Sequence, residues 1–372
     1  MGELSQVGPG KIPKIVWILL FGINALPWLL FSYADILAMD SHFVSRAGML
    51  WGRDFSNQWF GGKFALDGLN VYDNAAYREA IRSFGAIAFQ NYSYPPHTLL
   101  LGAILALFPY PIALFIWAVG GSVLLYHAAK PFVPFSPWLV LLVPSLARIP
   151  YGQFGLLASA LFLCAMRGSG IAAGFLTMKP HLGILLAAAM AVKKRFRQIV
   201  IALAVTVLLL LLSESAFGLG SAFLHEGLQT QALVLRTGFD AAYFTVMPSA
   251  YVAMRHTGFE WLAQAVAAAA ALLILWKFRS ASLSDLTFPV ATATFIVLPY
   301  SFGYDMALVS VGFAIILYSH WAELGWAERL VAILAFSVPN LIATHCAPLV
   351  LLAGLWLQLV VWRRESTGGL TN

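Results

Sequence analysis

Long, uninterrupted apolar runs constrain this chain more than any other feature of its sequence. A helix crosses the roughly 30 Å of hydrocarbon in a bilayer with about 20 apolar residues, and several runs approach that length. They cover residues 15–33, 112–129, 199–212, 261–276, 283–300, 306–318, 330–342 and 347–362. The alternating strands of a membrane barrel contain no such runs. The sequence therefore predicts an all-α polytopic membrane protein, with ten to twelve crossings.

The composition argues against a water-soluble fold. Hydrophobic residues make up 60% of the 372 residues and charged residues only 10%, whereas a soluble domain carries about 25% charged residues. The first apolar run lacks a small-residue cleavage site, so we expect a retained helix and not a removed signal peptide. Cys164 and Cys346 stand in apolar surroundings, which is typical of buried small side chains and not of a disulfide or a metal pair.

Basic residues gather where short cytoplasmic loops are expected, as the orientation rule for membrane proteins predicts. The clusters are Lys193-Lys194-Arg195-Phe196-Arg197, Lys11 with Lys14, Lys277 with Arg279, and Arg363-Arg364. No basic patch interleaved with aromatics indicates a nucleic-acid groove, so the net charge of +6 does not point to a nucleic-acid partner. This orientation makes residues 34–94 and 214–257 two extracytoplasmic loops of a single domain, residues 1–372.

The first of these loops holds an unusual share of the charges. It contains Asp35, Asp40, Arg46, Arg53, Asp54, Lys63, Asp67, Asp73, Arg78, Glu79 and Arg82. Loops of this length are usually functional or disordered, and the aromatic content argues against disorder. We expect short helices at the membrane interface near residues 59–66 and 74–84, with Trp59 and Phe60 as interfacial anchors.

The apolar stretches between residues 95 and 193 are broken by proline and glycine. Non-helical backbone at membrane depth is tolerated only where it is buried in protein or lines a wet cavity. Residues 171–192 form either one crossing or two half-helices that meet at Lys179-Pro180. The orientation rule favours the second alternative, because it leaves Arg167 and Lys193 both in the cytoplasm.

Ionisable side chains in so apolar a chain are candidates for function. Asp54 follows the first helix amid aromatics and could accept a proton from a substrate hydroxyl; alternatively, it caps a short interfacial helix. Asp40, Asp67 and Asp73 compete for the same role. Asp67 and Asp73 precede Gly68 and Asn74, a pattern typical of turns and caps.

Lys179 lies inside an apolar stretch, where a lysine must snorkel, pair or face a polar cavity. In a cavity it could hold an anionic phosphate as a point charge, and the alternative is a structural ion pair. Neighbouring His181 could share that anion or be a hydrogen-bonded core histidine. Asp305 follows Tyr304 at the start of a helix, where a carboxylate also favours the helix N-terminus.

Four further residues are candidates for substrate binding. Gln153 could bind sugar hydroxyls or cap a broken helix. Arg236 and Arg255 of the second outer loop could bind a phosphate. Tyr94 precedes Pro95-Pro96, and proline is favourable in the first turn of a helix. This motif alone indicates a helix start and not a binding site. The sequence has no motif typical of a zinc protease, a Walker loop, a nucleophile elbow or a Cys–His metal site, so no cofactor or metal is called for.

Several short motifs follow one another from Arg53 to Asp305. They are Asp54-Phe55, Trp59, Gly68-Leu69-Asn70-Val71-Tyr72-Asp73, Tyr94-Pro95-Pro96, Trp117, Gly152-Gln153, Lys179-Pro180 with the basic run after it, and Pro299-Tyr300-Ser301-Phe302-Gly303-Tyr304-Asp305. In this order they resemble glycosyltransferase family 87. Its members are bacterial integral-membrane enzymes of the GT-C fold, related to polyprenol-phosphate-mannose-dependent mannosyltransferases.

The resemblance implies an inverting glycosyltransferase at the outer side of the bacterial inner (plasma) membrane. It would move a hexose such as mannose from a polyprenyl-phosphate donor to a hydroxyl of a glycan or glycolipid acceptor, with Asp54 as the general base. Some family members have histidines where this chain has Tyr304-Asp305, so a histidine role does not carry over. The alternative interpretation is a transporter or flippase of lipid-linked sugars, which would use the same charges without a proton acceptor.

Overall fold

The structure, a computed structural model, describes residues 12–37, 39, 43–44, 50–85, 91–147, 149–230, 232 and 247–368. Two of the candidates from the sequence, Asp40 and Arg236, lie outside these residues.

Helices form nearly all the regular structure in this part of the chain, and its β pairing is the isolated bridge Val44–Leu50. The α-helices are α1 (Lys14–Leu37), α2 (Arg53–Leu66), α3 (Asn74–Ser83), α4 (Thr98–Ala106), α5 (Tyr110–Ala129), α6 (Gly155–Met166), α7 (Gly170–Leu176), α8 (Ile184–Val192), α9 (Phe196–Phe217), α10 (Gly220–Ala222), α13 (Ala250–Ala253), α14 (Glu260–Lys277), α15 (Thr287–Val297), α16 (Ala307–His320), α17 (Trp326–Leu341) and α18 (Ala347–Gly368). Short 3-10 or π turns are η1 (Pro137–Leu142), η2 (Ile149–Tyr151), η3 (Pro180–Gly183), η4 (Phe223–Gly227), η5 (Gly303–Asp305) and η6 (Ile342–Thr344).

Six helices among the described residues are long and apolar enough to cross a membrane: α1, α5, α9, α14, α17 and α18. Only 6% of the apolar window of α9 is buried inside the protein, so this helix presents a large apolar surface that lipid would cover. Four shorter apolar helices accompany them, α6, η3 with α8, α15 and α16. The predicted all-α polytopic class is confirmed, and the number of crossings stays a prediction.

The short helices α15 and α16 show why apolar runs alone do not identify crossings. Their side chains are buried almost throughout, against α17, α18 and each other. An apolar helix enclosed by other helices does not need to match the thickness of the bilayer, because protein and not lipid surrounds it.

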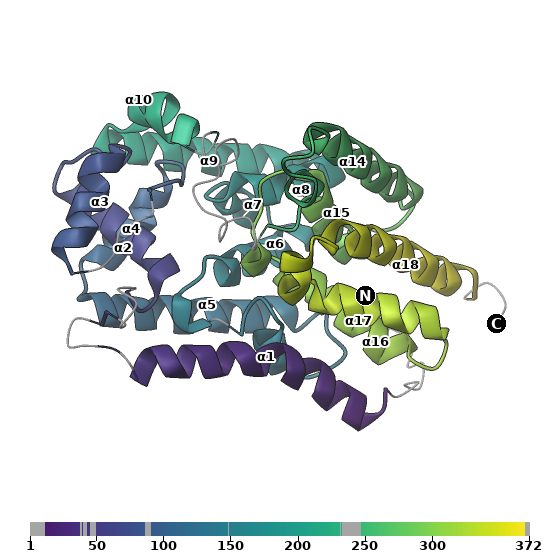
Figure 1. Cartoon of the computed structure of the whole chain (residues 1–372). Coiled ribbons are helices and arrows are strands. Elements are labelled where there is room, and N and C mark those ends of the chain that lie inside the picture. Colours follow the sequence, from purple (N-terminus) through teal and green to yellow (C-terminus); the bar gives the residue numbers. More distant parts are fainter. Residues whose placement is uncertain are drawn as a thin grey trace.

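The two loops predicted to lie outside the membrane meet at one end of the molecule. Asn70 Nδ2 donates to Glu226 Oε2 (3.1 Å), and Asn74 Nδ2 donates to Thr230 Oγ1 (2.9 Å). Figure 1 shows α2, α3 and α10 together at this end, whereas α18 ends at the opposite one. The shared end agrees with the predicted topology, although which side of the membrane it faces stays a prediction.

Helix α2 is less interfacial than the sequence suggested. A Cβ atom at Gly62 would lie 2.0 Å from the carbonyl carbon of Gly102, so α2 and α4 pack with their backbones in contact. Small residues allow this close approach. Trp59 and Phe60 are buried against Phe84, and Trp59 also against Tyr110, so their expected role as interfacial anchors is wrong. Asp73 caps α3 as predicted, its Oδ1 accepting from the N–H groups of Ala75 and Ala76.

Residues 170–192 fold as two half-helices and not as one crossing. Helix α7 runs alongside the first half of α9 in the same direction, with Gly170 against Gln198 and Gly174 against Ala202 and Val205. The chain turns at Lys179, and α8 returns to the start of α9. Thr177, just before the turn, contacts Thr206, which lies about 15 Å along α9 at about 1.5 Å per residue. The turn therefore lies near the middle of α9, as the second alternative predicts.

Candidate active site

A buried ion pair lies at the turn between α7 and α8. Lys179 Nζ is 2.6 Å from both Oδ1 and Oδ2 of Asp305, which belongs to η5. The side chains are only 4% and 0% exposed. The sequence left three alternatives for Lys179: snorkelling, pairing or facing a polar cavity. The structure shows the ion pair. A buried charge needs such a partner, because removing an ion from water without compensation is costly.

Aromatic rings line this ion pair. Lys179 Nζ lies 4.9 Å from the ring centroid of Tyr304 and 5.8 Å from that of Phe154. Phe154 stacks on Tyr94 at 5.5 Å, and Tyr304 stacks on Phe302 at 4.9 Å. The negative faces of these rings stabilise the ammonium group.

Asp54 is the second residue of α2, which begins directly after the left-handed residue Gly52. A helix N-terminus favours a negative charge at this position. Burial raises the pKa of Tyr94 and of Tyr304 well above the usual range, and the charges of Asp305 and Asp54 raise both further. Both carboxylates therefore act on Tyr94 and Tyr304. Tyr304 contacts Lys179 directly, and Tyr94 lies behind Phe154.

The segment from Gly152 to Gly155 connects the two centres. A Cβ atom at Gly152 (φ 67°) would lie 2.4 Å from the Cβ atom of Phe55, the residue after Asp54. A Cβ atom at Gly155 would lie 2.5 Å from the carbonyl oxygen of Tyr304. The segment thus reaches from the start of α2 to η5, and glycine at each end allows the contact.

Gln153 lies within this segment and is 2% exposed. Its Oε1 atom is buried and has no hydrogen-bond partner among the described residues. Buried acceptors are usually paired, and Gln153 is one of several described residues with an unpaired buried polar atom, Gln58 and Gln358 among them.

The other candidates lie around this centre. The ring of His181 is 6.4 Å from that of Tyr300. Arg255 follows α13, whose Tyr251 and Val252 form a small cluster with Phe302, the residue stacked on Tyr304. The structure thus brings together Asp54, Tyr94, Gln153, Lys179, Tyr304 and Asp305, with His181 and Arg255 at the periphery.

Two residues were missed by the sequence reasoning. The guanidinium carbon of Arg53 lies 4.6 Å from the ring centroid of Tyr151, which precedes Gly152. Phe154 is the ring between Tyr94 and Lys179. Both stand directly beside residues that the sequence did single out, Asp54 and Gln153, and this adjacency was the available signal.

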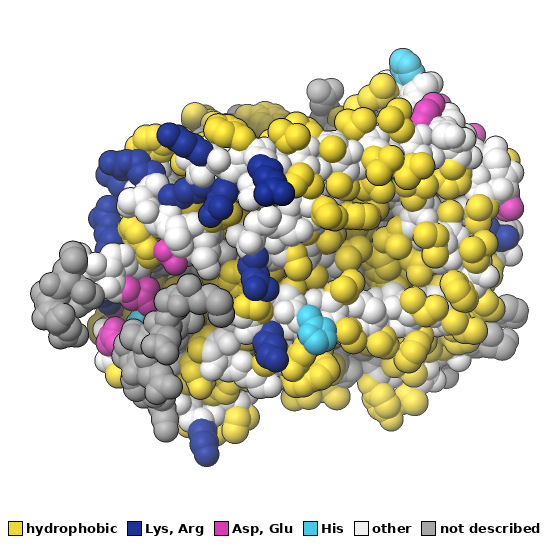
Figure 2. Space-filling view, turned by 180° about the vertical axis from the view of Figure 1, so that it is seen from behind, with side chains coloured by type: hydrophobic (Ala, Val, Ile, Leu, Met, Phe, Trp, Pro, Cys, Tyr) yellow, Lys and Arg dark blue, Asp and Glu magenta, His cyan; other side chains and the backbone are white. Residues whose placement is uncertain are grey.

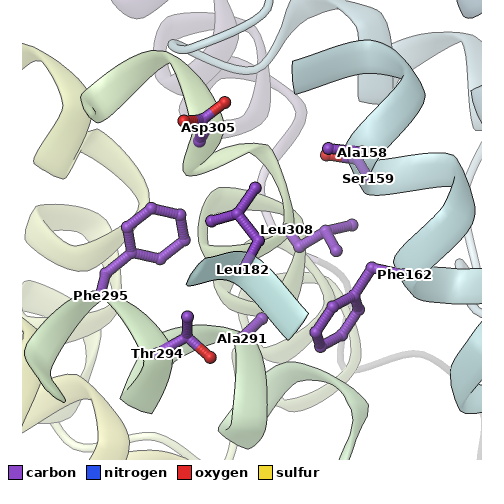
Figure 3. Close-up of a pocket in the computed structure, with 9 residues that line it drawn as sticks. All are labelled: Ala158, Ser159, Phe162, Leu182, Ala291, Thr294, Phe295, Asp305 and Leu308. Atoms are coloured by element: carbon purple, nitrogen blue, oxygen red, sulfur yellow. The ribbon is translucent and has the colours of Figure 1, made fainter. Parts of the chain in front are cut away.

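A small cavity has Asp305 in its wall. Its volume is about 20 Å³, and it is lined by Ala158, Ser159, Phe162, Leu182, Ala291, Thr294, Phe295, Asp305 and Leu308 (Figure 3). This volume holds about one water molecule and is too small for a sugar. Within the described ranges, no group of three or more His, Cys, Asp or Glu side chains could hold a metal ion.

Comparison with known families gives one match. Residues 92–301 match the family model of glycosyltransferase family 87, which covers more than half of the 372-residue chain. Tyr94, Gln153 and Lys179 lie inside the matched segment, whereas Asp54 and Asp305 lie outside it. No curated protein and no solved structure shows a significant match.

Proposed function

Because this chain belongs to glycosyltransferase family 87, as its motifs predicted, we propose that it transfers a hexose such as mannose from a polyprenyl-phosphate donor. The acceptor is a hydroxyl group of a glycan or glycolipid, and the transfer takes place with inversion at the outer face of the membrane. Membership of this family favours a transferase over the transporter interpretation. A transporter would move the lipid-linked sugar without breaking the bond between sugar and phosphate.

The observation that carries the proposal is the segment from Gly152 to Gly155. It packs against the start of α2, where Asp54 lies, and against η5, which holds Asp305 of the ion pair with Lys179. Transfer from a lipid phosphate needs a base for the incoming hydroxyl and a cation for the leaving phosphate. Asp54 and Lys179 supply groups of these two kinds. The shared aromatic lining suits a site that excludes water from the reacting groups.

The proposed step is a single displacement. The acceptor hydroxyl gives its proton to the Asp54 carboxylate while its oxygen bonds to the anomeric carbon of the sugar. The bond between that carbon and the phosphate oxygen breaks, and its electron pair stays on the phosphate. Polyprenyl phosphate leaves, and attack on the opposite face inverts the anomeric configuration.

Lys179 can bind the phosphate without losing Asp305. An ammonium group has three N–H donors, and Asp305 accepts two of them through its two oxygens. The third remains for a phosphate oxygen. Tyr94 and Tyr304 have raised pKa values, so they act as neutral O–H donors to phosphate or sugar oxygens and not as bases.

Arg53 supplies a second cation beside Asp54. Its planar guanidinium, held over Tyr151, can donate two parallel hydrogen bonds to a phosphate. Arg53 and Lys179 offset the negative charges of Asp54 and Asp305, which favours binding of an anionic donor in this apolar environment.

The test is transfer by the purified protein from radiolabelled polyprenyl-phosphate mannose to extracted glycolipid acceptors. We expect a labelled product from the wild type and a turnover about 100- to 10,000-fold lower for Asp54→Asn, because the general base is lost. The matched control is Asp67→Asn, an exposed carboxylate at the other end of α2, which should keep full activity. Wild-type turnover of Asp54→Asn would refute the role of the base, and donor movement without product would support a transporter.

A further inference from the structure

One corner of the molecule carries basic side chains that the proposed reaction does not use. It is formed by the turn between α8 and α9 and by the C-terminal end of α14. We call it the basic corner, and its members are Lys193, Lys194, Arg195, Arg197, Lys277 and Arg279. Lys193 Nζ donates to the backbone oxygen of Arg279 (2.7 Å), so segments 86 residues apart are joined here. All members except half-buried Lys193 are exposed.

The negative charges at the same end are engaged elsewhere. Arg364 pairs with Glu328 (2.7 Å), and His320 lies 3.3 Å from Glu323 and 3.1 Å from Glu365. In the described part of the chain, no ion pair includes a member of the basic corner. The acid nearest to it in sequence, Asp285, caps its own turn by accepting from the N–H of Ser282. The positive charge of the basic corner is therefore largely uncompensated.

Apolar surface adjoins the basic corner. Phe196, between Arg195 and Arg197, is 60% exposed, and Trp276, whose ring centroid lies 5.6 Å from the guanidinium carbon of Arg279, is 59% exposed. Helices α9 and α14 extend from it with only 6% and 17% of their apolar windows buried. Figure 2 shows Lys and Arg side chains gathered towards one end of the molecule beside a broad hydrophobic surface. Exposed aromatic rings at such a boundary are typical of the level of lipid headgroups.

We propose that the basic corner binds the anionic headgroup of a membrane phospholipid such as phosphatidylglycerol. Basic clusters between helix ends attract anionic lipids, and arginine binds a phosphate through two parallel hydrogen bonds. The acyl chains would lie along the exposed sides of α9 and α14. The orientation rule accounts for positive charge in each loop separately. It does not require the contact between Lys193 and Arg279 that joins the two loops.

The test uses the purified full chain in mixed micelles of phosphatidylglycerol and phosphatidylcholine, with the lipids retained after gel filtration counted by mass spectrometry. We expect the wild type to retain phosphatidylglycerol preferentially. Replacing two exposed members, Lys194→Gln with Arg197→Gln, should weaken this association about tenfold. The control, Lys63→Gln with Arg82→Gln, removes the same charge from exposed positions in the first loop and should leave the preference unchanged.

Three outcomes would overturn the proposal. They are equal retention of the two lipids by the wild type, an unchanged preference in the corner variant, and displacement of the lipid by glycerol phosphate, which would indicate a site for free anions. Each single substitution is measured as well, together with its melting temperature, so that a folding defect in the double variant does not decide the result. The measurement is made in micelles without substrate and is therefore independent of membrane orientation and of the proposed transfer.

Discussion

At the scale of single residues, Lys179 depends on a partner that lies 126 residues away in the sequence. Its local sequence left open whether it pairs, snorkels or faces a cavity. Both oxygens of Asp305 contact its ammonium group, which makes the pair a structural unit as well as a proposed phosphate site. Stability and function must therefore be separated by experiment.

A double-mutant cycle separates them. Lys179→Met should lower the free energy of unfolding by about 3–5 kcal/mol, because it leaves the buried Asp305 carboxylate unpaired. Adding Asp305→Leu removes that charge and should restore most of the stability, while transfer stays abolished. Melting temperature and donor turnover are the two measurements. Activity of the stable double variant close to that of the wild type would remove Lys179 from the phosphate role.

For Gln153 we expect a substitution to lower activity without lowering stability. Its Oε1 has no partner among the described residues, so Gln153→Leu should leave the melting temperature unchanged or raise it. If the amide binds a substrate hydroxyl, kcat/KM should fall about fivefold, which corresponds to one hydrogen bond of about 1 kcal/mol. A less stable variant with the kcat/KM of the wild type would show that Gln153 only supports the backbone.

The candidate site could be predicted in part at this scale. Asp54, Gln153, Lys179 and Asp305 could be selected because charged or amide groups are rare in so apolar a chain. Arg53 and Phe154 could not, because their roles come from rings next to them in space, Tyr151 for Arg53 and Tyr94 for Phe154. Sequence separation gives no information about such contacts.

At the scale of elements, the hairpin of α7 and α8 delivers Lys179 to the middle of the bundle. The sequence left a single crossing and two half-helices both open, since the same apolar residues and one proline fit either. Contacts of Gly170 and Gly174 with α9 decide between them. Glycine is needed there because any larger side chain would separate α7 from α9.

The packing of α2 on α4 positions Asp54 and gives a test at this scale. Gly62→Ala would place a Cβ atom 2.0 Å from the backbone of Gly102, which should destabilise the protein by about 1–3 kcal/mol. The displacement of α2 should also lower kcat, by up to about 100-fold for a shift of 1 Å. The control is Gly120→Ala in α5, where a Cβ atom would meet nothing within 4 Å. Equal stability and equal kcat of the two variants would show that the contact between α2 and α4 does not position Asp54.

At the scale of the whole molecule, the arrangement of the two ends predicts a pattern of accessibility. Because α7 and α8 turn back at Lys179, exposed Arg167 and Lys194 belong to one end, and exposed Asp67 and Glu226 to the other. Single cysteines at these positions, in a chain without Cys164 and Cys346, should react with an impermeant maleimide in two groups. Labelling of Arg167→Cys from the same side as Asp67→Cys would refute the hairpin.

The fold class and the family were accessible from the sequence, because hydrophobic runs and the order of short motifs are properties of the chain itself. Each of the eight apolar runs overlaps a helix of the structure, although α15 covers only Thr287–Val297 of the run 283–300. The sequence could not show that 283–300 and 306–318 lie in helices enclosed by protein, because burial depends on neighbours far along the chain. For the same reason, only the tertiary structure decided that Lys179 meets Asp305 and that Gln153 lies between them and Asp54. Such convergence depends on how the helices pack, and packing contacts join residues that no local pattern relates.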